Sequence, residues 1–400
     1  MKEITVTEPA FVTHFSCSGS ACRDHCCKGW KITLDKTTVK KYLASKDTAI
    51  RTIAQDHIIL LKKNNSHWGE IKLPSALGNC PYLDEDRLCR VQKTLGAKAL
   101  SHTCSSFPRA HHTYKNEVRN SLSLACPEVT SRILNDPDAM ALSEKTIIQQ
   151  TFNTAPLFPA QQKLLNLFCL SLINHANSST EAALYALIKF VMYAQKFAKI
   201  DDAALGELEQ VYAALLEQLQ TGVLAQELMN IAPDSKVKTS LVLQMQDYFR
   251  SLPLNRGSVI LDHYIQCLLR VLTAEEGVSM EQKVSDIESS LARCLQADEQ
   301  QKNWAFRNLI LYKIWENNFP NQPNVDPLRA LYIIVAEYAF IKLLTAASVH
   351  ERGRLEWDVT NIVYSFHSRS QHNSEVAANF HRHIETVRTG DDLSMIHLLT

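Results

Sequence analysis

Two stretches of this 400-residue chain differ in their hydrophobic pattern. From about residue 136 onward, apolar residues recur at intervals of three and four, which is the spacing of one face of an α-helix. Glycine and proline are sparse there and lie between the apolar runs. The clearest runs are residues 164–173, 183–194, 211–219, 241–249, 264–272, 287–295 and 331–344. We therefore predict a helical domain over residues 136–400, with roughly eight to ten helices and a loop at residues 319–326.

Shorter patterns and more turn-forming residues mark the preceding part of the chain. Residues 38–54 and 91–100 read as amphipathic helices, and residues 30–34 alternate as in a short strand. Residues 58–73 fit neither pattern. The sequence therefore predicts a mainly α fold, in which a small cysteine-rich metal-binding domain over residues 1–135 precedes the helical domain. The helical domain is expected to bind the substrate or support the first domain.

Composition limits the classes of protein to which the chain can belong. With 46% hydrophobic and 21% charged residues, it is long enough to bury two or three cores of ordinary size. The net charge is zero, but residues 1–130 carry 19 Lys and Arg against 12 Asp and Glu, and the remainder carries 23 against 30. The basic excess of the first part serves equally well to neutralise bound thiolates or to face an anionic partner. No concentrated stripe of Lys and Arg is present, which argues against nucleic-acid binding.

Targeting and membrane signals are missing from the pattern. Residues 1–15 lack the basic start, the apolar stretch and the cleavage site of a secretory signal. No window of about eighteen residues is both apolar and uncharged, and even the run at residues 331–344 is broken by Glu337. We therefore expect a soluble, cytoplasmic protein without membrane insertion.

Cysteine is concentrated in the first part of the chain. In the cytoplasm thiols stay reduced, so a dense array of cysteines favours metal binding over disulfides. Three cysteines of the second part, at 169, 267 and 294, fall on apolar helical stripes, where a free cysteine usually packs as a small hydrophobic residue. The eight candidate metal ligands of the first part are Cys17, Cys22, Cys26, Cys27, Cys80, Cys89, Cys104 and Cys126.

Spacing leaves the ligand sets and the metal open. Cys22, Cys26 and Cys27 share one loop, so little entropy is lost when they close on one ion, while the later four must arrive from separate segments. Two sites of four ligands fit these positions, and so does one site of four with four other thiols. Paired CxxC motifs typical of zinc are missing, and so is the CxxxCxxC motif of radical enzymes. Spacing therefore does not separate zinc from iron–sulfur.

The residues around the cysteines are more specific than their spacing. Four blocks, FSCSGSACRDHCCKGW (15–30), NCPYLDEDRLC (79–89), LGAKALSHTCSSFPR (95–109) and SLSLACPE (121–128), resemble the flagellin lysine-N-methylase family. Weaker similarity extends to residues 337–344 and 363–373. The resemblance implies methyl transfer from S-adenosylmethionine to lysine ε-amines of flagellin. It also implies a four-iron, four-sulfur cluster held by cysteines, with zinc as the alternative metal.

One absence qualifies this resemblance. The chain has eleven glycines and no GxGxxG-like turn between a strand and a helix. A doubly wound Rossmann sheet, which commonly binds S-adenosylmethionine, is therefore not expected. The cysteine-rich domain becomes the natural place for the cofactor and for catalysis.

Methyl transfer requires a neutral lysine amine, so a base or a desolvating pocket is needed. Candidates for accepting or orienting the amine are Asp84, Glu85, Asp86 and Glu128, with Tyr82 and Tyr114 as hydroxyl partners. For the acidic triplet, a solvated turn that caps the next helix is the favoured alternative, and Glu128 serves equally well as a charge at a helix N-terminus.

Two further residues are candidates for binding the cofactor. Trp30 follows the cysteine pair closely enough to face a sulfonium, with core packing as the alternative. Arg109 is a candidate for the cofactor carboxylate, with a structural ion pair as the alternative. Late histidines at 367, 372, 381 and 383 lie in a polar helical stretch and are expected to be surface or capping groups.

Two hypotheses that assign the chain to other functional classes remain besides the methylase. The first is a non-catalytic, zinc-stabilised adaptor in flagellar assembly, whose helical domain binds a partner. The second is an iron–sulfur redox protein.

Overall fold

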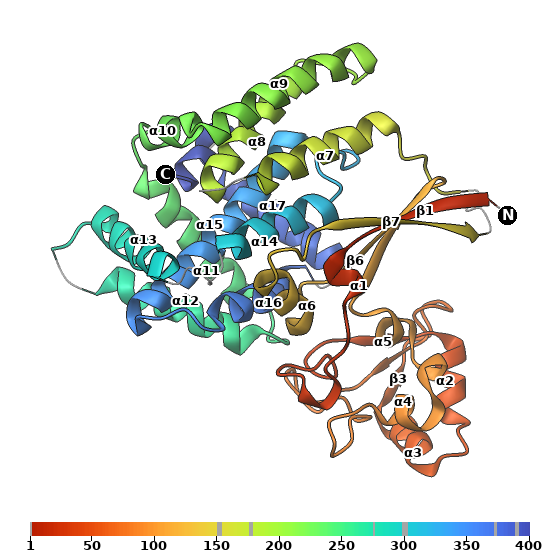
Figure 1. The fold of residues 1–400 in the computed structure, drawn as a ribbon. Coiled ribbons are helices and arrows are strands. Elements are labelled where there is room, and N and C mark those ends of the chain that lie inside the picture. Colours follow the sequence, from red (N-terminus) through yellow and green to blue (C-terminus); the bar gives the residue numbers. More distant parts are fainter. Residues whose placement is uncertain are drawn as a thin grey trace.

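The computed structural model describes residues 2–149, 154–175, 179–274, 277–297, 303–371, 374–388 and 392–400. Its described part consists of a large helical body and a small body that holds most of the cysteines (Figure 1). We call the small body, residues 17–107, the cysteine-rich unit, and the remainder the helical unit. The two are joined at helix α1 (Ala10–Thr13) and at a small sheet (Figure 1).

Helices of the helical unit follow the predicted apolar runs. Several begin where a Ser or Asp side chain accepts a backbone N–H of the first turn, as Ser179, Asp201 and Asp326 do. The described residues hold eleven α-helices after residue 136, one more than the upper expectation, and residues 319–326 form the expected loop. They are α7 (Ala160–Asn174), α8 (Thr180–Ala194), α9 (Asp202–Gln220), α10 (Val223–Met229), α11 (Ser235–Ser251), α12 (Ser258–Thr273), α13 (Met280–Ala297), α14 (Asn303–Glu316), α15 (Pro327–Arg352), α16 (Asp358–Ser370) and α17 (Ser374–Val387).

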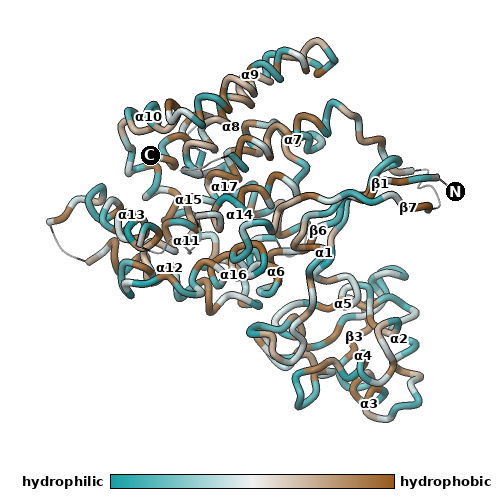
Figure 2. The backbone as a smooth tube through the Cα atoms, in the orientation of Figure 1, coloured by the Kyte–Doolittle hydropathy of each residue, from teal (hydrophilic) through white to brown (hydrophobic). Residues whose placement is uncertain are grey.

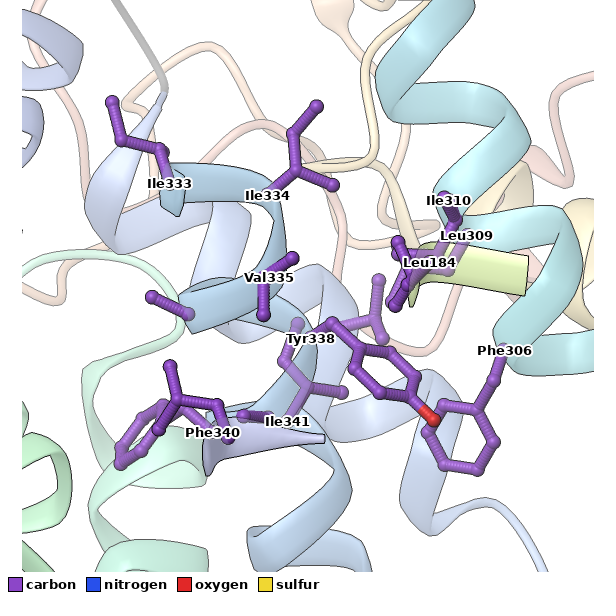
Figure 3. Packing of buried hydrophobic residues seen from close by; sticks show 14 of the residues in the cluster. Leu184, Phe306, Leu309, Ile310, Ile333, Ile334, Val335, Tyr338, Phe340 and Ile341 are labelled. Atoms are coloured by element: carbon purple, nitrogen blue, oxygen red, sulfur yellow. The ribbon is translucent and has the colours of Figure 1, made fainter. Parts of the chain in front are cut away.

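Helix α15 forms the centre of the helical unit. Most residues of α15 are buried, as expected for a helix that is apolar all round. Hydrophobic positions also recur along the helices around it (Figure 2). Figure 3 shows Tyr338 of α15 directed toward Phe306 of α14, with the ring centroids 5.8 Å apart. In length and hydropathy, α15 is the one described helix able to cross a membrane, yet 94% of its apolar window is buried inside the protein. Cys169 and Cys267 are buried in the same core, as predicted.

A four-stranded sheet that the sequence did not predict lies beside the helices. Its order is β5-β6-β1-β7, and of these pairs only β1 with β6 is parallel. The described residues therefore contain no doubly wound sheet, and the mainly α fold is confirmed. The sheet was missed because its partners are distant in sequence, as with Thr5 opposite Glu117. The strands are β1 (Lys2–Pro9), β5 (Arg109–Thr113), β6 (Glu117–Leu122) and β7 (Leu142–Gln149).

The cysteine-rich unit has its own small core around a three-stranded antiparallel sheet. The single helix predicted over residues 38–54 is in fact two, because Asp47 accepts the backbone N–H of Ile50 and starts a new helix. The ambiguous residues 58–73 supply two strands. The elements are β2 (Ile32–Leu34), α2 (Lys36–Leu43), α3 (Thr48–His57), β3 (Ile58–Leu60), β4 (Gly69–Ile71), α4 (Arg90–Leu95) and α5 (His102–Ser106).

Segments on both sides of the cysteine-rich unit belong to the large core. Phe11 of α1, Leu122 of β6 and Ile133 of α6 (Pro127–Asn135) all pack among the helices. The domain boundary at residue 135 stays a prediction. In the packing, the small body is an insertion between α1 and β5.

One histidine expected to be a surface or capping group is buried, so the surface prediction was wrong for His367. Its side chain is 2% exposed, its Nδ1 lies 2.7 Å from the Val363 carbonyl oxygen, and its Nε2 lies 3.3 Å from Lys313 Nζ. The surrounding serines made this stretch look polar, but small side chains let α16 pack closely on α6 and α12. The neighbouring His372 lies outside the described residues.

Candidate functional site

Five of the eight predicted cysteine ligands lie close together in the cysteine-rich unit. Each of their thiols is near enough to alter the pKa of others in the set. They come from the loop before β2, from the segment before α4, from the start of α4 and from α5. We call this set the five-thiol group: Cys26, Cys27, Cys80, Cys89 and Cys104.

Backbone pairing between loops brings these thiols together. The amide of Cys80 donates to the carbonyl of Cys27 at 2.7 Å, which joins the first two segments. An isolated antiparallel bridge pairs Leu83 with Cys89 and folds the next segment back toward the first. The geometry is therefore set by main-chain hydrogen bonds between short loops, which no local sequence pattern reveals.

Three of the eight cysteines lie at helix N-termini. Cys89 is the N-cap of α4, Cys126 is the N-cap of α6, and Cys104 lies in the first turn of α5. Burial raises the pKa of Cys89 and of Cys126, and the backbone N–H groups of the first turn counteract part of this rise. Such N–H groups favour a thiolate. The sequence held a signal for this, since a proline follows Cys126 directly, and proline is common at the first helical position.

The five thiols cannot all ionise at neutral pH without a cation. Desolvation raises the pKa of the buried Cys80 to about 12 and, although this residue is exposed, that of Cys104 to about 11; it also raises the pKa of Cys89. Cys27 donates a hydrogen bond to Cys26, which lowers the pKa of Cys26 to about 7 and raises that of Cys27. A bound metal ion would lower the pKa of the thiols that bind it, because it stabilises each of them as a thiolate.

Tyr82 adds an unsatisfied polar atom beside the thiols. Its side chain is 2% exposed, and its hydroxyl has no hydrogen-bond partner among the residues that the structure describes. The neighbouring thiols of Cys80 and Cys89 raise its pKa further than burial alone, which keeps the hydroxyl protonated and able to donate. A buried donor without an acceptor is unfavourable. A metal-bound sulfur would supply the acceptor, so the donor set fits a metal that prefers sulfur.

The thiols of the five-thiol group lie close together, but they are not arranged around a common point that a metal ion could occupy. Among the residues that the structure describes, no three Cys, His, Asp or Glu side chains already have the geometry of a metal site. Metal loading would therefore require the thiols to move. The metal-binding role of the cysteine-rich unit stays a prediction.

The remaining three cysteines lie outside the five-thiol group. Cys22 is near enough to Cys126 to raise its pKa, and Arg256 of the helical unit lies beside Cys126. Cys17 is exposed. By their mutual effects on pKa, the eight thiols thus fall into sets of five, two and one.

The acidic triplet of Asp84, Glu85 and Asp86 forms the turn before α4. The sequence indicated such a turn as the alternative to a catalytic role. The amide of Leu88 donates to Asp84 Oδ1 at 2.9 Å, and Lys93 Nζ lies 2.9 Å from both Asp84 and Asp86. The Lys93 ammonium lowers the pKa of the Asp84 carboxyl. Glu85 is exposed. Two of these three carboxylates are thus engaged by one lysine.

Glu128 and Tyr114 also have structural partners. Glu128 lies in the first turn of α6 and pairs with Arg132 at 3.3 Å. Tyr114 stacks on Phe158 with ring centroids 4.7 Å apart, and its hydroxyl accepts a hydrogen bond from Asn318 at 3.1 Å. These contacts of Tyr114 belong to the helical unit, and the five-thiol group does not take part in them.

The two candidate cofactor residues differ in their surroundings. Trp30 is half-buried and meets the edge of Phe107, with ring centroids 4.7 Å apart, and the guanidinium of Arg256 lies 5.6 Å from its ring. The place that a sulfonium would take over this ring is thus shared with Arg256. Arg109 is exposed at the start of β5, 6.0 Å from the ring of Phe15. Sequence reasoning missed Arg256, which lies about 130 residues from the cysteine array.

Comparison with known proteins gives consistent matches. A family model described as the FliB lysine N-methylase C-terminal domain matches residues 166–398, which contain none of the eight cysteines. A protein named Lysine-N-methylase from Salmonella typhimurium strain LT2 is 98% identical over 401 aligned positions, covering all of both chains. A Salmonella muenchen protein named Flagellar biosynthetic protein FliV is 97% identical over 173 residues, which cover 43% of this chain and 100% of that protein. A second protein from Salmonella muenchen, named Flagellar biosynthetic protein FliU, is 97% identical over 145 residues, which cover 36% of this chain and 86% of that protein. No solved structure matches the chain.

Proposed function

Since the chain belongs to the FliB lysine N-methylase family, and is thus a lysine methyltransferase, we propose that it methylates lysine ε-amines of flagellin with S-adenosylmethionine as the methyl donor. The flagellar names of the two shorter relatives support flagellin as the substrate. We place the reaction in the cytoplasm, before flagellin is exported. No nucleic acid and no membrane insertion take part in this proposal.

The observation that carries the proposal for the site is the five-thiol group beside the unpartnered Tyr82 hydroxyl. Cys80, Cys89 and Cys104 would hold a four-iron, four-sulfur cluster and leave its fourth iron without a protein ligand; together with one thiol of the Cys26–Cys27 pair, they would hold zinc as the alternative. An iron–sulfur cluster with one open iron supplies a place for the amino and carboxylate groups of the cofactor. Tyr82 would donate its O–H to a metal-bound sulfur.

Desolvation is the better supported way to obtain a neutral lysine amine. A free lysine has a pKa of about 10.4, so it is protonated at neutral pH. Asp84, Asp86 and Glu128 are already paired with Lys93 and Arg132, which reduces their ability to accept a proton. Burying an amine in an apolar pocket lowers its pKa without a base. Close alignment of the amine with the methyl group would then provide much of the rate.

An anaerobic assay tests the proposal as a whole. The purified full-length protein, with flagellin and radiolabelled S-adenosylmethionine, should transfer label to flagellin lysines, and the protein should be brown with bound iron and sulfide. Replacing Cys80 or Cys104 by Ala should abolish metal binding, whereas Cys294→Ala, a half-buried cysteine on α13, should not. Colourless, zinc-loaded protein that still transfers label would remove only the iron–sulfur part of the proposal.

A non-catalytic adaptor is the second candidate. It is favoured by the engaged carboxylates of the acidic triplet, since Asp84 and Asp86 are both paired with Lys93. In that case flagellin lysine methylation would be unchanged in a strain lacking this protein.

A further inference from the structure

Three separate segments of the chain meet at one buried side chain, Arg256. It lies in the loop between α11 and α12, belongs to the helical unit and is 3% exposed. Its Nη2 donates to the carbonyl oxygen of Asp24 at 2.6 Å, and its Nη1 donates to the carbonyl oxygen of Ala125 at 2.8 Å. Its Nε lies 3.2 Å from Asp24 Oδ2. Its backbone amide donates to the carbonyl of Gly29 at 2.9 Å.

The position of these acceptors relates Arg256 to the thiols. Asp24 lies between Cys22 and Cys26 in the chain, and Ala125 directly precedes Cys126. We call residues 22–29 the cysteine loop. One guanidinium therefore holds the cysteine loop and the segment that carries Cys126 in a fixed relation.

Only an arginine fits this place. Its planar fork donates in several directions at once, whereas a lysine offers a single point charge. Burying a cation is costly unless it is paired, and here Asp24, itself 3% exposed, supplies the opposite charge. The rings of Trp30 and Phe107, 5.6 and 5.9 Å away, cover the guanidinium.

The loop that presents Arg256 is itself held from the helical side. Arg369 of α16 is 3% exposed and donates to the carbonyl oxygens of Phe249 and Pro253 and to Asn255 Oδ1. A second arginine therefore fixes residues 249–255 onto the helical core. The contacts of Arg369 and Arg256 therefore connect α16 to the cysteine loop through the loop between α11 and α12.

We propose that Arg256 is a positioning residue that holds the cysteine loop and Cys126 against the helical unit, so that the helical unit sets how the N-terminal thiols lie relative to one another. Its importance for methyl transfer rests on the proposed function. Its effect on the thiols does not, and it is measured without cofactor or flagellin.

Thiol labelling of the metal-free, reduced, full-length protein tests the proposal. With N-ethylmaleimide and mass spectrometry of each cysteine, Arg256→Ala should label Cys126 and Cys22 about tenfold faster, as expected for a loss of roughly 1.4 kcal/mol of local stability. Cys80 and Cys89 should keep their rates, because the residues next to them in the chain do not contact Arg256. Arg256→Lys should behave like the alanine variant, since the fork is lost. Added guanidinium at low concentration should restore protection in Arg256→Ala.

A matched control tests whether any contact between the units has the same effect. Arg23 reaches the helical unit at the exposed edge of the contact, with its guanidinium 4.0 Å from the Trp357 ring and 3.3 Å from Asn361 Oδ1. Arg23→Ala should leave the labelling of Cys126 within about twofold of the original, because exposed contacts contribute little.

A second pair of variants leaves the guanidinium in place. Gly29 has a φ of +68°, and a Cβ built there would lie 2.7 Å from the Arg256 backbone nitrogen, so Gly29→Ala must push the cysteine loop away. It should reproduce the Arg256→Ala labelling pattern without rescue by guanidinium. Gly96→Ala, at a φ of +81° with no heavy atom within 4 Å of its Cβ, is the control for backbone strain alone. Unchanged labelling of Cys126 in Arg256→Ala, or an equal rise at all eight thiols, would overturn the proposal.

Discussion

Two tyrosines of the cysteine-rich unit show how one hydrogen bond distinguishes a structural side chain from a candidate site residue. The rings of Tyr42 and Tyr82 contact each other with centroids 5.4 Å apart, and both are 2% exposed. Tyr42 donates to the carbonyl oxygen of Ala99 at 2.9 Å, whereas Tyr82 has no acceptor in the described part of the chain. A buried hydroxyl without a partner lowers stability and is retained more readily where something binds.

This difference predicts opposite effects of the same substitution. In metal-free protein, Tyr82→Phe should raise the free energy of unfolding by up to about 1 kcal/mol, because an unsatisfied group is removed. Tyr42→Phe should lower it by about 1 kcal/mol, because the Ala99 carbonyl loses its donor. Urea unfolding followed by tyrosine fluorescence measures both. Equal destabilisation by the two variants would show that Tyr82 already has a partner in solution.

Residue types were more predictable than residue contacts. The sequence picked out the eight cysteines of the first part, and it correctly placed Cys169 and Cys267 in a core. It did not divide the eight into five, two and one, because that division depends on pairing between loops such as Cys27 with Cys80. Arg256 was missed for the same reason, since nothing near it in the chain indicates a thiol.

At the scale of elements, helix periodicity was a good guide and sheet formation was not. The apolar runs of α7, α8 and α15 lie in helices as predicted. Strands β1 and β7 instead pair across most of the first 149 residues, so neither has a local partner that the pattern could reveal. Between helices, the charged group of Glu181, Lys342 and Tyr338 ties α8 to α15.

The Glu181 group predicts acid sensitivity. Burial alone would raise the pKa of the Glu181 carboxyl, but Lys342 and the Tyr338 hydroxyl hold it at about 2, below its ordinary value of 4.5. Because the folded pKa is lowered, the carboxylate stabilises the fold above about pH 4.5, and this contribution is lost as the pH falls toward 2. The contribution at neutral pH is roughly 2–3 kcal/mol.

Substitution of Glu181 should therefore matter most near neutral pH. Glu181→Gln is expected to lower the free energy of unfolding at pH 7 and to approach the unsubstituted protein near pH 2.5, in urea titrations over this range. Glu207→Gln, at an exposed carboxylate of α9, is the control and should change stability by less than about 0.5 kcal/mol. A pH-independent difference for Glu181→Gln would contradict the assignment.

At the scale of the whole molecule, two cores of unequal size are present. The core of the cysteine-rich unit is small, whereas the large core extends from α1 to the C-terminal segment. Small bodies with few buried apolar residues are marginally stable and commonly depend on a metal or on contacts with a neighbour. The mainly α architecture was predictable, but the insertion of the small body between α1 and β5 was not.

Two unequal cores predict two unfolding transitions in metal-free protein. The cysteine-rich unit should unfold at the lower temperature, seen by calorimetry and as fast amide exchange over residues 32–99. A metal ion at about 100 times its Kd should raise the free energy of unfolding of the cysteine-rich unit by about 2.7 kcal/mol and leave the second transition unchanged. A single transition that shifts as a whole on metal addition would mean that the contact through Arg256 makes the units one cooperative body.

The order of segments along the chain also has a consequence for biosynthesis. The last cysteine of the array, Cys126, leaves the ribosome 130 residues before Arg256, which at about 5–20 residues per second corresponds to roughly 7 to 26 s. During that interval the cysteine-rich unit is already synthesised, but the arginine that fixes the cysteine loop does not yet exist. In the nascent chain, Arg256 therefore does not yet hold the cysteine loop, and metal ions or oxidants reach the thiols most easily during this interval.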